Sequence, residues 1–242
     1  MGLADLHIHT IYSYDGTASV PAVLRRAKQI GLDVIAITDH DEISGSLKAL
    51  ELAPNYGVEV IPGIEITTAE GDLLALNVME NIPRDLSLVE TALRVRQLGG
   101  FCIAPHPMAG GVGMKSLSAY SILKALRNTD VAQTLIAIET YNATLIDKMS
   151  NHYAHILAER LDIAQTASSD AHVVEALGLG ATEFDGCTAQ DLILALQNRE
   201  TRQRKQKEWN AVRILGSWAA NYIGSAFTRL TNTAYYWRLK WK

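Results

Sequence analysis

Residues 3–9 have the sequence LADLHIH, an apolar segment that leads into two histidines one position apart. In an extended strand, residues two apart point to the same face, so His7 and His9 could bind one ion. Imidazole nitrogens and carboxylate oxygens are the ligand types that hold Zn, Mn or Fe. The segment therefore predicts a strand that ends at a metal site. The alternative is a pair of core histidines satisfied by hydrogen bonds.

Five further short motifs repeat this pattern of an apolar run followed by polar side chains. They are YDG at 14–16, TDHD at 38–41, GIE at 63–65, PHP at 105–107 and SDAH at 169–172. Together with residues 7 and 9 they contain five of the seven histidines. Such recurrence favours a metalloenzyme over isolated core histidines.

Strand-like and helix-like segments alternate along the chain. Hydrophobic periodicity and turn residues predict strands at 3–9, 33–38, 58–61, 64–68, 73–79, 101–104, 134–138 and 163–167. The same signals predict helices at 17–31, 43–56, 86–98, 117–126, 145–161 and 189–197. Alternation of this kind predicts parallel βα units. Since the polar motifs follow many different strands, an α/β barrel fits better than an open doubly wound sheet, which concentrates its site at one switch point.

The bulk composition excludes some classes of protein. The 242 residues are 48% hydrophobic and carry a net charge of −4, which suits one large core and argues against a general nucleic-acid binder. Cys102 and Cys187 form no CxxC pair, and the first residues lack a basic, apolar signal sequence. No apolar run has the length of about 20 residues that a membrane span needs. We therefore expect a reduced, cytoplasmic protein.

The C-terminal segment differs from the rest of the chain. Residues 199–242 hold ten Lys and Arg against two Glu, and all four tryptophans lie there. We therefore divide the chain into a core at 1–200 and a basic, Trp-rich helical tail at 201–242. Aromatic and cationic residues together suit a membrane surface, another anionic partner or stacking on nucleic-acid bases. The alternative is a terminal helix packed on the core or on a second subunit.

The ordered set DLHIHT, YDG, TDHD, PGIE, PHP and SSDAH resembles the PHP (polymerase and histidinol phosphatase) family of metal-dependent phosphoesterases. The resemblance runs from Asp5 to His172 and implies a distorted seven-stranded (β/α) barrel. It implies that one ion is bound by His7, His9, Glu65 and Asp170, with Glu65 bridging to a second ion at His106. It also implies that a third ion is bound by Asp15, His40 and His172.

Two or three divalent ions follow from the resemblance, and mixed His and carboxylate ligation favours Mn, Zn or Fe over Mg. Many relatives carry a further His shortly after the GIE motif, where this chain has Asp72. Asp72 is therefore a further candidate ligand, although its side chain is shorter. The alternative role for Asp72 is that of a turn residue.

Other polar residues near these motifs are candidates for supporting roles. Asp5 shares the face of His7 and would orient an imidazole, and Asp39 beside His40 would act similarly or be structural. Glu139 and Asn142 follow a strand and would face the ligands or the substrate, or Asn142 would cap a helix. Lys115 and the Gly-rich segment at 110–113 would bind a phosphate or form a plain loop.

These residues predict hydrolysis of a phosphate ester by metal-activated water, with His40, Asp170 and His172 acting as catalytic metal-site residues. No Ser or Cys nucleophile motif is evident, and the general acid is unassigned. A small phosphomonoester such as a nucleotide is the first choice of substrate. The alternatives are an exonuclease acting on short oligonucleotides, a C–N hydrolase of the amidohydrolase type, and a non-catalytic metal-binding scaffold acting through its tail. We expect no stable nucleic-acid complex.

Overall fold

The structure, a computed structural model, describes residues 1–110, 114–145, 148–204 and 211–224. Its strands are β1 (Gly2–Asp5), β2 (Val34–Ile35), β3 (Glu59–Val60), β4 (Gly63–Thr67), β5 (Asp72–Leu76), β6 (Phe101–Ala104), β7 (Leu135–Asn142), β8 (Ala164–Ser168), β9 (Ala181–Phe184) and β10 (Arg202–Arg204). Its α-helices are α1 (Val20–Ile30), α2 (Ser44–Leu52), α3 (Leu88–Gln97), α4 (Ala119–Ala125), α5 (Thr129–Thr134), α6 (Lys148–Leu161), α7 (Ala189–Asn198) and α8 (Ala211–Gly224). Two short 3-10 helices, η1 (Ala53–Asn55) and η2 (Val174–Ala176), complete the described elements.

The strands form two mixed sheets of five strands each, in the orders β10-β9-β1-β2-β3 and β4-β5-β6-β7-β8. Neighbours β1, β2 and β3 are parallel, as are β6, β7 and β8. By contrast, β9 runs antiparallel to β1 and β10, and β5 runs antiparallel to β4 and β6. The α/β class is therefore confirmed, but not every strand follows the expected parallel βα pattern.

The expected closed seven-stranded barrel is not what the described residues form. The sheets meet at isolated bridges, Ile8 with Ala171 and His40 with Glu65. Between β8 and β9 the Thr182 hydroxyl accepts a hydrogen bond from the Ala167 N–H at 2.9 Å and donates one to the Ala167 carbonyl at 3.0 Å. A side chain therefore occupies the place of main-chain pairing there, which interrupts the ladder that a closed barrel requires.

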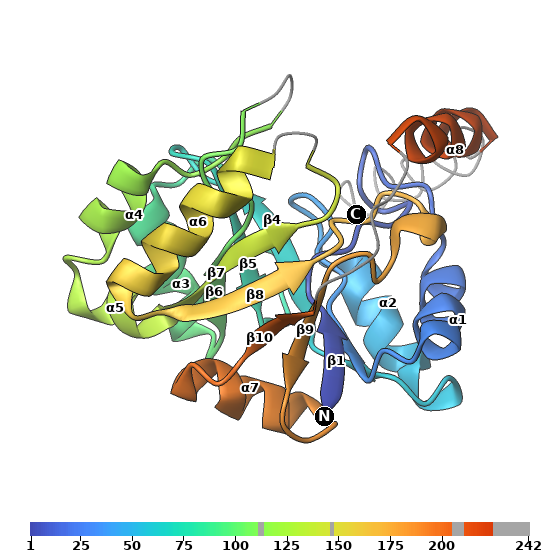
Figure 1. Cartoon of the computed structure of the whole chain (residues 1–242), viewed down its shortest axis with the longest axis horizontal. Helices are drawn as coiled ribbons and strands as arrows, with labels where there is room; N and C mark the ends of the chain where they lie inside the picture. The colour runs from blue at the N-terminus through green and yellow to red at the C-terminus, as the bar shows by residue number, and fades with distance from the viewer. Residues whose placement is uncertain (111–113, 146–147, 205–210, 225–242) are drawn as a thin grey trace, which may run out of the picture.

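Local sequence signals explain where the main helices begin and end. Helix α1 has Pro near its start, and ends at Gly31 with φ of 75°. Helices α3 and α7 each begin with a capping box, formed by Ser87 with Glu90 and by Thr188 with Asp191. Figure 1 shows α3 to α6 on one side of the molecule, α1 and α2 on the other, and α7 below the strands.

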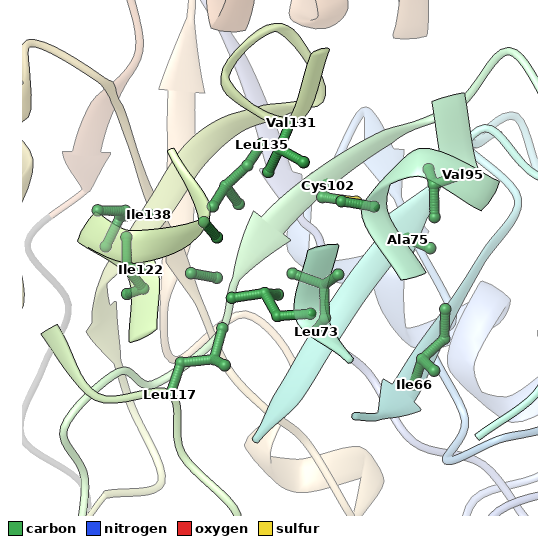
Figure 2. Packing of buried hydrophobic residues seen from close by; sticks show 14 of the residues in the cluster. Ile66, Leu73, Ala75, Val95, Cys102, Leu117, Ile122, Val131, Leu135 and Ile138 are labelled. Carbon is green, nitrogen blue, oxygen red and sulfur yellow. The ribbon is translucent and has the colours of Figure 1, made fainter. Parts of the chain in front are cut away.

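The buried apolar residues form three clusters. Figure 2 shows the largest, in which strands β4 to β7 pack against the helices that cover them, through Ile66, Leu73, Ala75, Val95, Cys102, Leu117, Ile122, Val131, Leu135 and Ile138. A second cluster lies beneath α1 and α2, and a third fills the space between the two sheets and α7. The close packing within these clusters fixes the strand ends that carry the polar motifs.

Several expected elements differ in extent. The strand expected at 3–9 ends at Asp5, so His7 and His9 follow the strand instead of lying within it. The segment expected as a strand at 134–138 is preceded by the unexpected helix α5, and β9 and β10 were not expected at all. Within the described residues, no helix combines the length and apolar character needed to cross a membrane. Both cysteines are free, and burial raises the pKa of the Cys102 thiol.

Candidate metal centre

The polar motifs converge at the end of the molecule where the two sheets meet. His7 and His9 follow β1, His40 follows β2, Glu65 lies on β4 and His106 follows β6. Asp170 and His172 follow β8, and the loop after β1 brings Asp15 beside them. These eight residues, predicted as ligands from widely separated motifs, are thus brought together by the strand ends.

Glu65 lies at the centre of this group and is fully buried. Its Oε2 is 3.2 Å from His7 Nε2, from His9 Nε2 and from His40 Nδ1, and its Oε1 is 3.2 Å from His106 Nε2. Two ligands that are each about 2.1 Å from one ion lie about 3.0–3.4 Å apart, given tetrahedral or right-angled coordination. The spacing around Glu65 is therefore that of atoms sharing ions.

Three imidazoles have a partner on the nitrogen that faces away from the centre. The Nδ1 of His7 contacts Glu139 Oε1 at 3.2 Å, the Nδ1 of His106 contacts Ser116 Oγ at 3.1 Å, and the Nδ1 of His172 contacts the Asp170 carbonyl at 3.0 Å. Each arrangement leaves Nε2 directed inward. A partner on the outer nitrogen fixes the tautomer and the ring orientation of a metal-binding histidine.

Asp170 and His9 lie side by side in the centre. Asp170 Oδ1 is 3.2 Å from His9 Nε2 and 3.5 Å from His7 Nε2. Its other oxygen, Oδ2, accepts hydrogen bonds from Asn142 Nδ2 at 3.1 Å and from Thr144 Oγ1 at 3.3 Å. The carboxylate is therefore oriented by one oxygen and leaves the other facing the imidazoles.

A third part of the centre is formed by Asp15, His40 and His172. Asp15 Oδ2 is 3.0 Å from His172 Nε2 and 3.5 Å from His40 Nε2. The adjacent Gly16 is required by close packing, because a Cβ atom there would lie 2.1 Å from the Thr10 carbonyl oxygen. The glycine of the YDG motif thus permits the loop approach that presents Asp15.

Asp72 also lies at this centre, as part of a group with His40 and Glu65. Since β5 runs antiparallel to β4, its first residue lies at the same end of the sheet as the last residues of β4. Asp72 is therefore not only a turn residue, and it can offer a carboxylate oxygen to a metal ion despite its short side chain.

The donor set fits divalent cations. The described residues form four overlapping groups whose ligand atoms lie within 4.8 Å of one another, namely His9-Asp15-His40-His172, His7-Glu65-His106, His7-His9-Asp170 and His40-Glu65-Asp72. Among the described side chains, the buried His9 Nε2, Asp170 Oδ1 and Asp72 Oδ1 have no hydrogen-bond partner. Buried polar atoms without partners are costly. Ions would satisfy all three.

The charged state of the centre is consistent with this interpretation. Burial opposes protonation of His7, but the carboxylates of Asp170, Glu65 and Glu139 outweigh it and hold the pKa well above its ordinary value. Burial likewise lowers the pKa of His172, but Asp15 and Asp170 raise it overall to about 9. Protons therefore neutralise the carboxylates when cations are absent, and ions must displace them on binding.

Asp5 and Asp39 hold loops instead of imidazoles. Asp5 accepts hydrogen bonds from the Ser169 N–H at 3.0 Å, from the Ser169 hydroxyl at 2.5 Å and from the Gly178 N–H at 3.0 Å. Asp39 accepts from the N–H and the hydroxyl of Thr10 at 2.5 and 2.7 Å. Asp5 was predicted to orient an imidazole, but its described hydrogen bonds are to Ser169 and Gly178. Its carboxylate therefore fixes the loop that carries Asp170.

Glu139 and Asn142 lie directly behind the predicted ligands. Glu139 Oε2 accepts hydrogen bonds from the His106 N–H at 2.8 Å and from Asn142 Nδ2 at 2.9 Å. Helix α6 begins at Lys148, so Asn142 does not cap it. Of the two roles considered for Asn142, contact with the site is the one observed.

The expected phosphate loop is described only in part. Lys115 is exposed, and its carbonyl accepts a hydrogen bond from the Asp72 N–H at 2.6 Å, which brings the residue close to the centre. Residues 111–113 lie outside the described residues, as do 205–210 and 225–242 of the tail. Phosphate binding by this loop and the tail's contact with a membrane or other anionic surface therefore stay predictions.

Two predicted ligands have unusual backbone conformations. His106 has φ of 29° and Asp170 has φ of 52°, in the left-handed region that non-glycine residues rarely adopt. Such conformations cost free energy and persist where the surrounding structure enforces them. Their presence at two strand ends supports a functional role for the end of the molecule where the two sheets meet.

A cavity of about 290 Å³ opens onto the centre, lined by Tyr14, Asp15, His40, Glu65, Asp72, His106, Met114, Asp170 and His172. The ring of Tyr14 stacks on that of His40 with 5.0 Å between centroids, and Tyr14 is 68% exposed. Sequence reasoning missed Tyr14, Ser116 and Trp218, whose Nε1 donates to the Asp15 carbonyl at 2.9 Å. Tyr14 lay within a recognised motif, whereas the other two had no local signal.

Comparison with known proteins supports these observations. The family model described as the PHP domain matches residues 5–204. An uncharacterized protein of Methanocaldococcus jannaschii is 37% identical over 161 residues, which cover 62% of this chain and 88% of that protein. A 5'-3' exoribonuclease of Haemophilus influenzae is 27% identical over 197 residues, covering 80% of this chain and 63% of that enzyme.

A solved structure has a similar fold. A two-domain protein of Bacteroides vulgatus that contains a predicted PHP-like metal-dependent phosphoesterase matches with a TM-score of 0.69 and 20% identity. The match covers 84% of this chain and 64% of that one.

Proposed function

The chain belongs to the PHP domain family, and we propose that it is a metal-dependent phosphoesterase that hydrolyses a small phosphate monoester, with a nucleotide as the first candidate. The observation that carries the proposal is the convergence of four overlapping His and carboxylate groups on one cavity. The family match favours this reaction over C–N hydrolysis and over a non-catalytic scaffold.

Two or three divalent ions of Mn, Zn or Fe would be held by His7, His9, Asp15, His40, Glu65, His106, Asp170 and His172, with Asp72 as a further ligand. When bound, such ions lower the pKa of water and neutralise charge on phosphoryl oxygens. The unpartnered atoms of His9, Asp170 and Asp72 support this assignment.

The side chains behind these residues prepare the imidazoles for their task. As a carboxylate, Glu139 only accepts hydrogen bonds, so it keeps the proton of neutral His7 on Nδ1 and leaves Nε2 free to bind an ion. Asn142 and Thr144 hold Asp170 so that Oδ1 faces inward. The centre is thus ordered before any substrate arrives.

The cavity's composition favours water as the nucleophile. The described residues that line it include no Ser, Thr or Cys, and partial burial together with the charges of Asp15 and Glu65 raises the pKa of the Tyr14 hydroxyl to about 12. A covalent intermediate on a side chain is therefore disfavoured.

Charge and size restrict the substrate. Asp15, Glu65, Asp72 and Asp170 line the cavity, and carboxylates cannot donate hydrogen bonds to a phosphate, so a phosphate would bind there through the cations that they hold. The volume of about 290 Å³ lies at the lower limit of about 300 Å³ for ligand pockets. Both facts support a small ester bound through its ions.

A second candidate is an exonuclease-type reaction on short oligonucleotides. The similarity to an exoribonuclease over 80% of this chain favours it. The same ions would promote attack on a diester, and an open cavity could admit the end of a strand.

The test is phosphate release by metal-stripped protein to which Mn, Zn, Fe or Mg is restored. Substrates are an aryl phosphate monoester, a panel of nucleotides and an end-labelled short RNA. His9→Ala and Asp170→Ala remove buried groups of the centre, while His152→Ala changes an exposed histidine of α6 as control.

We expect metal-dependent monoester turnover that both site variants lose and the control retains. Degradation of the RNA without monoester turnover would establish the second candidate instead. Absence of turnover on every substrate, with ions bound, would refute both.

A further inference from the structure

The helix α8 contacts the metal centre from outside the region that the family model matches. Trp218 Nε1 donates a hydrogen bond to the Asp15 carbonyl at 2.9 Å, between residues 203 positions apart. The family match ends at residue 204, and α8 covers Ala211–Gly224. Figure 1 shows α8 next to the loop that follows β1. This contact therefore links a tail element to a predicted ligand.

The Trp218 ring is fixed by its surroundings. It is partly buried and packs against the apolar cluster beneath α1 and α2, to which Ile8 and Ala171 belong. On the helix itself, its ring lies 5.0 Å from that of Tyr222. A side chain held in this way can restrain the group to which it donates a hydrogen bond.

The loop that carries Asp15 is held from two sides. On one side the N–H and the hydroxyl of Thr17 donate to the His172 carbonyl at 3.0 and 2.8 Å. On the other side Trp218 holds the Asp15 carbonyl. The Asp15 side chain between them reaches His172 and His40.

We propose that Trp218 is a positioning residue for the ion held by His9, Asp15, His40 and His172, so that α8 is part of the metal centre. This inference rests on the metal centre of the proposed function, but not on any substrate. A displaced Asp15 would weaken this group first, because the hydrogen bonds and ion pairs described for Asp15 include none to His7, Glu65 or His106.

The first test is calorimetric titration of the metal-stripped full chain with Mn²⁺. Trp218→Phe keeps most of the ring and removes the N–H, while Trp218→Ala also removes the packing. Ile223→Ala is the matched control, because Ile223 lies on the same helix and is 76% exposed.

One neutral hydrogen bond corresponds to about a 2- to 10-fold change in an equilibrium constant. We expect Trp218→Phe to weaken one Mn²⁺ binding step by about that factor, Trp218→Ala to weaken it further, and Ile223→Ala to change none. Excess Mn²⁺ should restore full occupancy. Unchanged binding in both Trp218 variants, or an equal loss in all binding steps, would overturn the proposal.

The second test does not depend on a substitution at Trp218. Replacement of Trp209, Trp237 and Trp241 by Phe leaves Trp218 as the single tryptophan. Mn²⁺ has unpaired electrons and should quench the emission of a nearby indole, whereas closed-shell Zn²⁺ should not. Bound Mn²⁺ without quenching would show that α8 is not next to the centre. Both tests measure metal binding, so they remain informative if the proposed reaction is wrong.

Discussion

Glu139→Gln should separate metal binding from folding, because the change alters hydrogen-bond character and hardly alters shape. Glu139 Oε2 accepts from two donors, the His106 N–H and Asn142 Nδ2, while Oε1 faces His7 Nδ1 at 3.2 Å. A glutamine has only one oxygen, which should remain with the two donors. Its NH₂ group must then face His7 Nδ1.

This arrangement reverses the tautomer of neutral His7. An NH₂ group requires an acceptor, so the proton of the ring moves from Nδ1 to Nε2, the nitrogen directed at Glu65 and Asp170. A protonated nitrogen cannot bind a metal ion. Changes to such outer partners cost about 10- to 100-fold in metal affinity. That range corresponds to about 1.4–2.8 kcal/mol.

The assay is Mn²⁺ or Zn²⁺ affinity by competition with a chelator, together with ¹⁵N spectra of the metal-free protein at a pH high enough to make His7 neutral, which report its tautomer. Glu159→Gln is the matched control, because Glu159 is an exposed carboxylate 3.4 Å from His155, away from the centre. We expect the control to bind like the wild type. Glu139→Gln with wild-type affinity, or with His7 still protonated on Nδ1, would refute the reasoning.

Three further predictions concern pH, metal removal and the loop of Asp15. The pKa of His172 is raised to about 9 and those of the other central histidines are also raised, so metal ions must displace protons when they bind. The apparent metal affinity should therefore fall as the pH falls from about 9 to about 6, by about tenfold per pH unit for each proton displaced. Calorimetry in buffers of different ionisation enthalpy should detect the released protons. Constant affinity over this range would contradict it. Removal of ions present at 100 times their Kd should lower the free energy of unfolding by about 2.7 kcal/mol, and therefore lower Tm by about 5–11 °C in calorimetric scans. An unchanged Tm would argue against ions bound to the native state. Gly16→Ala should destabilise the fold by about 1–3 kcal/mol in urea unfolding and weaken one metal-binding step, because its Cβ would meet the Thr10 carbonyl, whereas Gly110→Ala, with open space around it, should be neutral. Equal stability of the two variants would show that the loop can relax.

More of the candidate site than of the sheet topology could be predicted from the sequence. His9, His40 and Asp170 are each recognisable from a few neighbouring residues, since a polar side chain directly after an apolar run marks a strand end. The ends of α1 were predictable for a similar reason, as Pro21 and Gly31 act locally.

Features that depend on distant partners could not be predicted in this way. Closure of a barrel requires pairing between the first and last strands, and no local pattern revealed that β9 runs antiparallel or that Thr182 interrupts the ladder. For the same reason the contacts of Asp5 with Ser169 and of Trp218 with Asp15 join segments that are more than 160 residues apart.

The hairpin of β4 and β5 has a consequence for how this centre can change. Thr67 pairs with Asp72, and only residues 68–71 separate them. Side chains alternate between the faces of a strand, so one inserted turn residue that shifted the register would turn Asp72 away and present a neighbour in its place. The length of this turn therefore selects which side chain completes the cluster. Because the neighbours of Asp72 are Gly71 and Leu73, such an insertion would remove one carboxylate from the cluster and leave every motif intact.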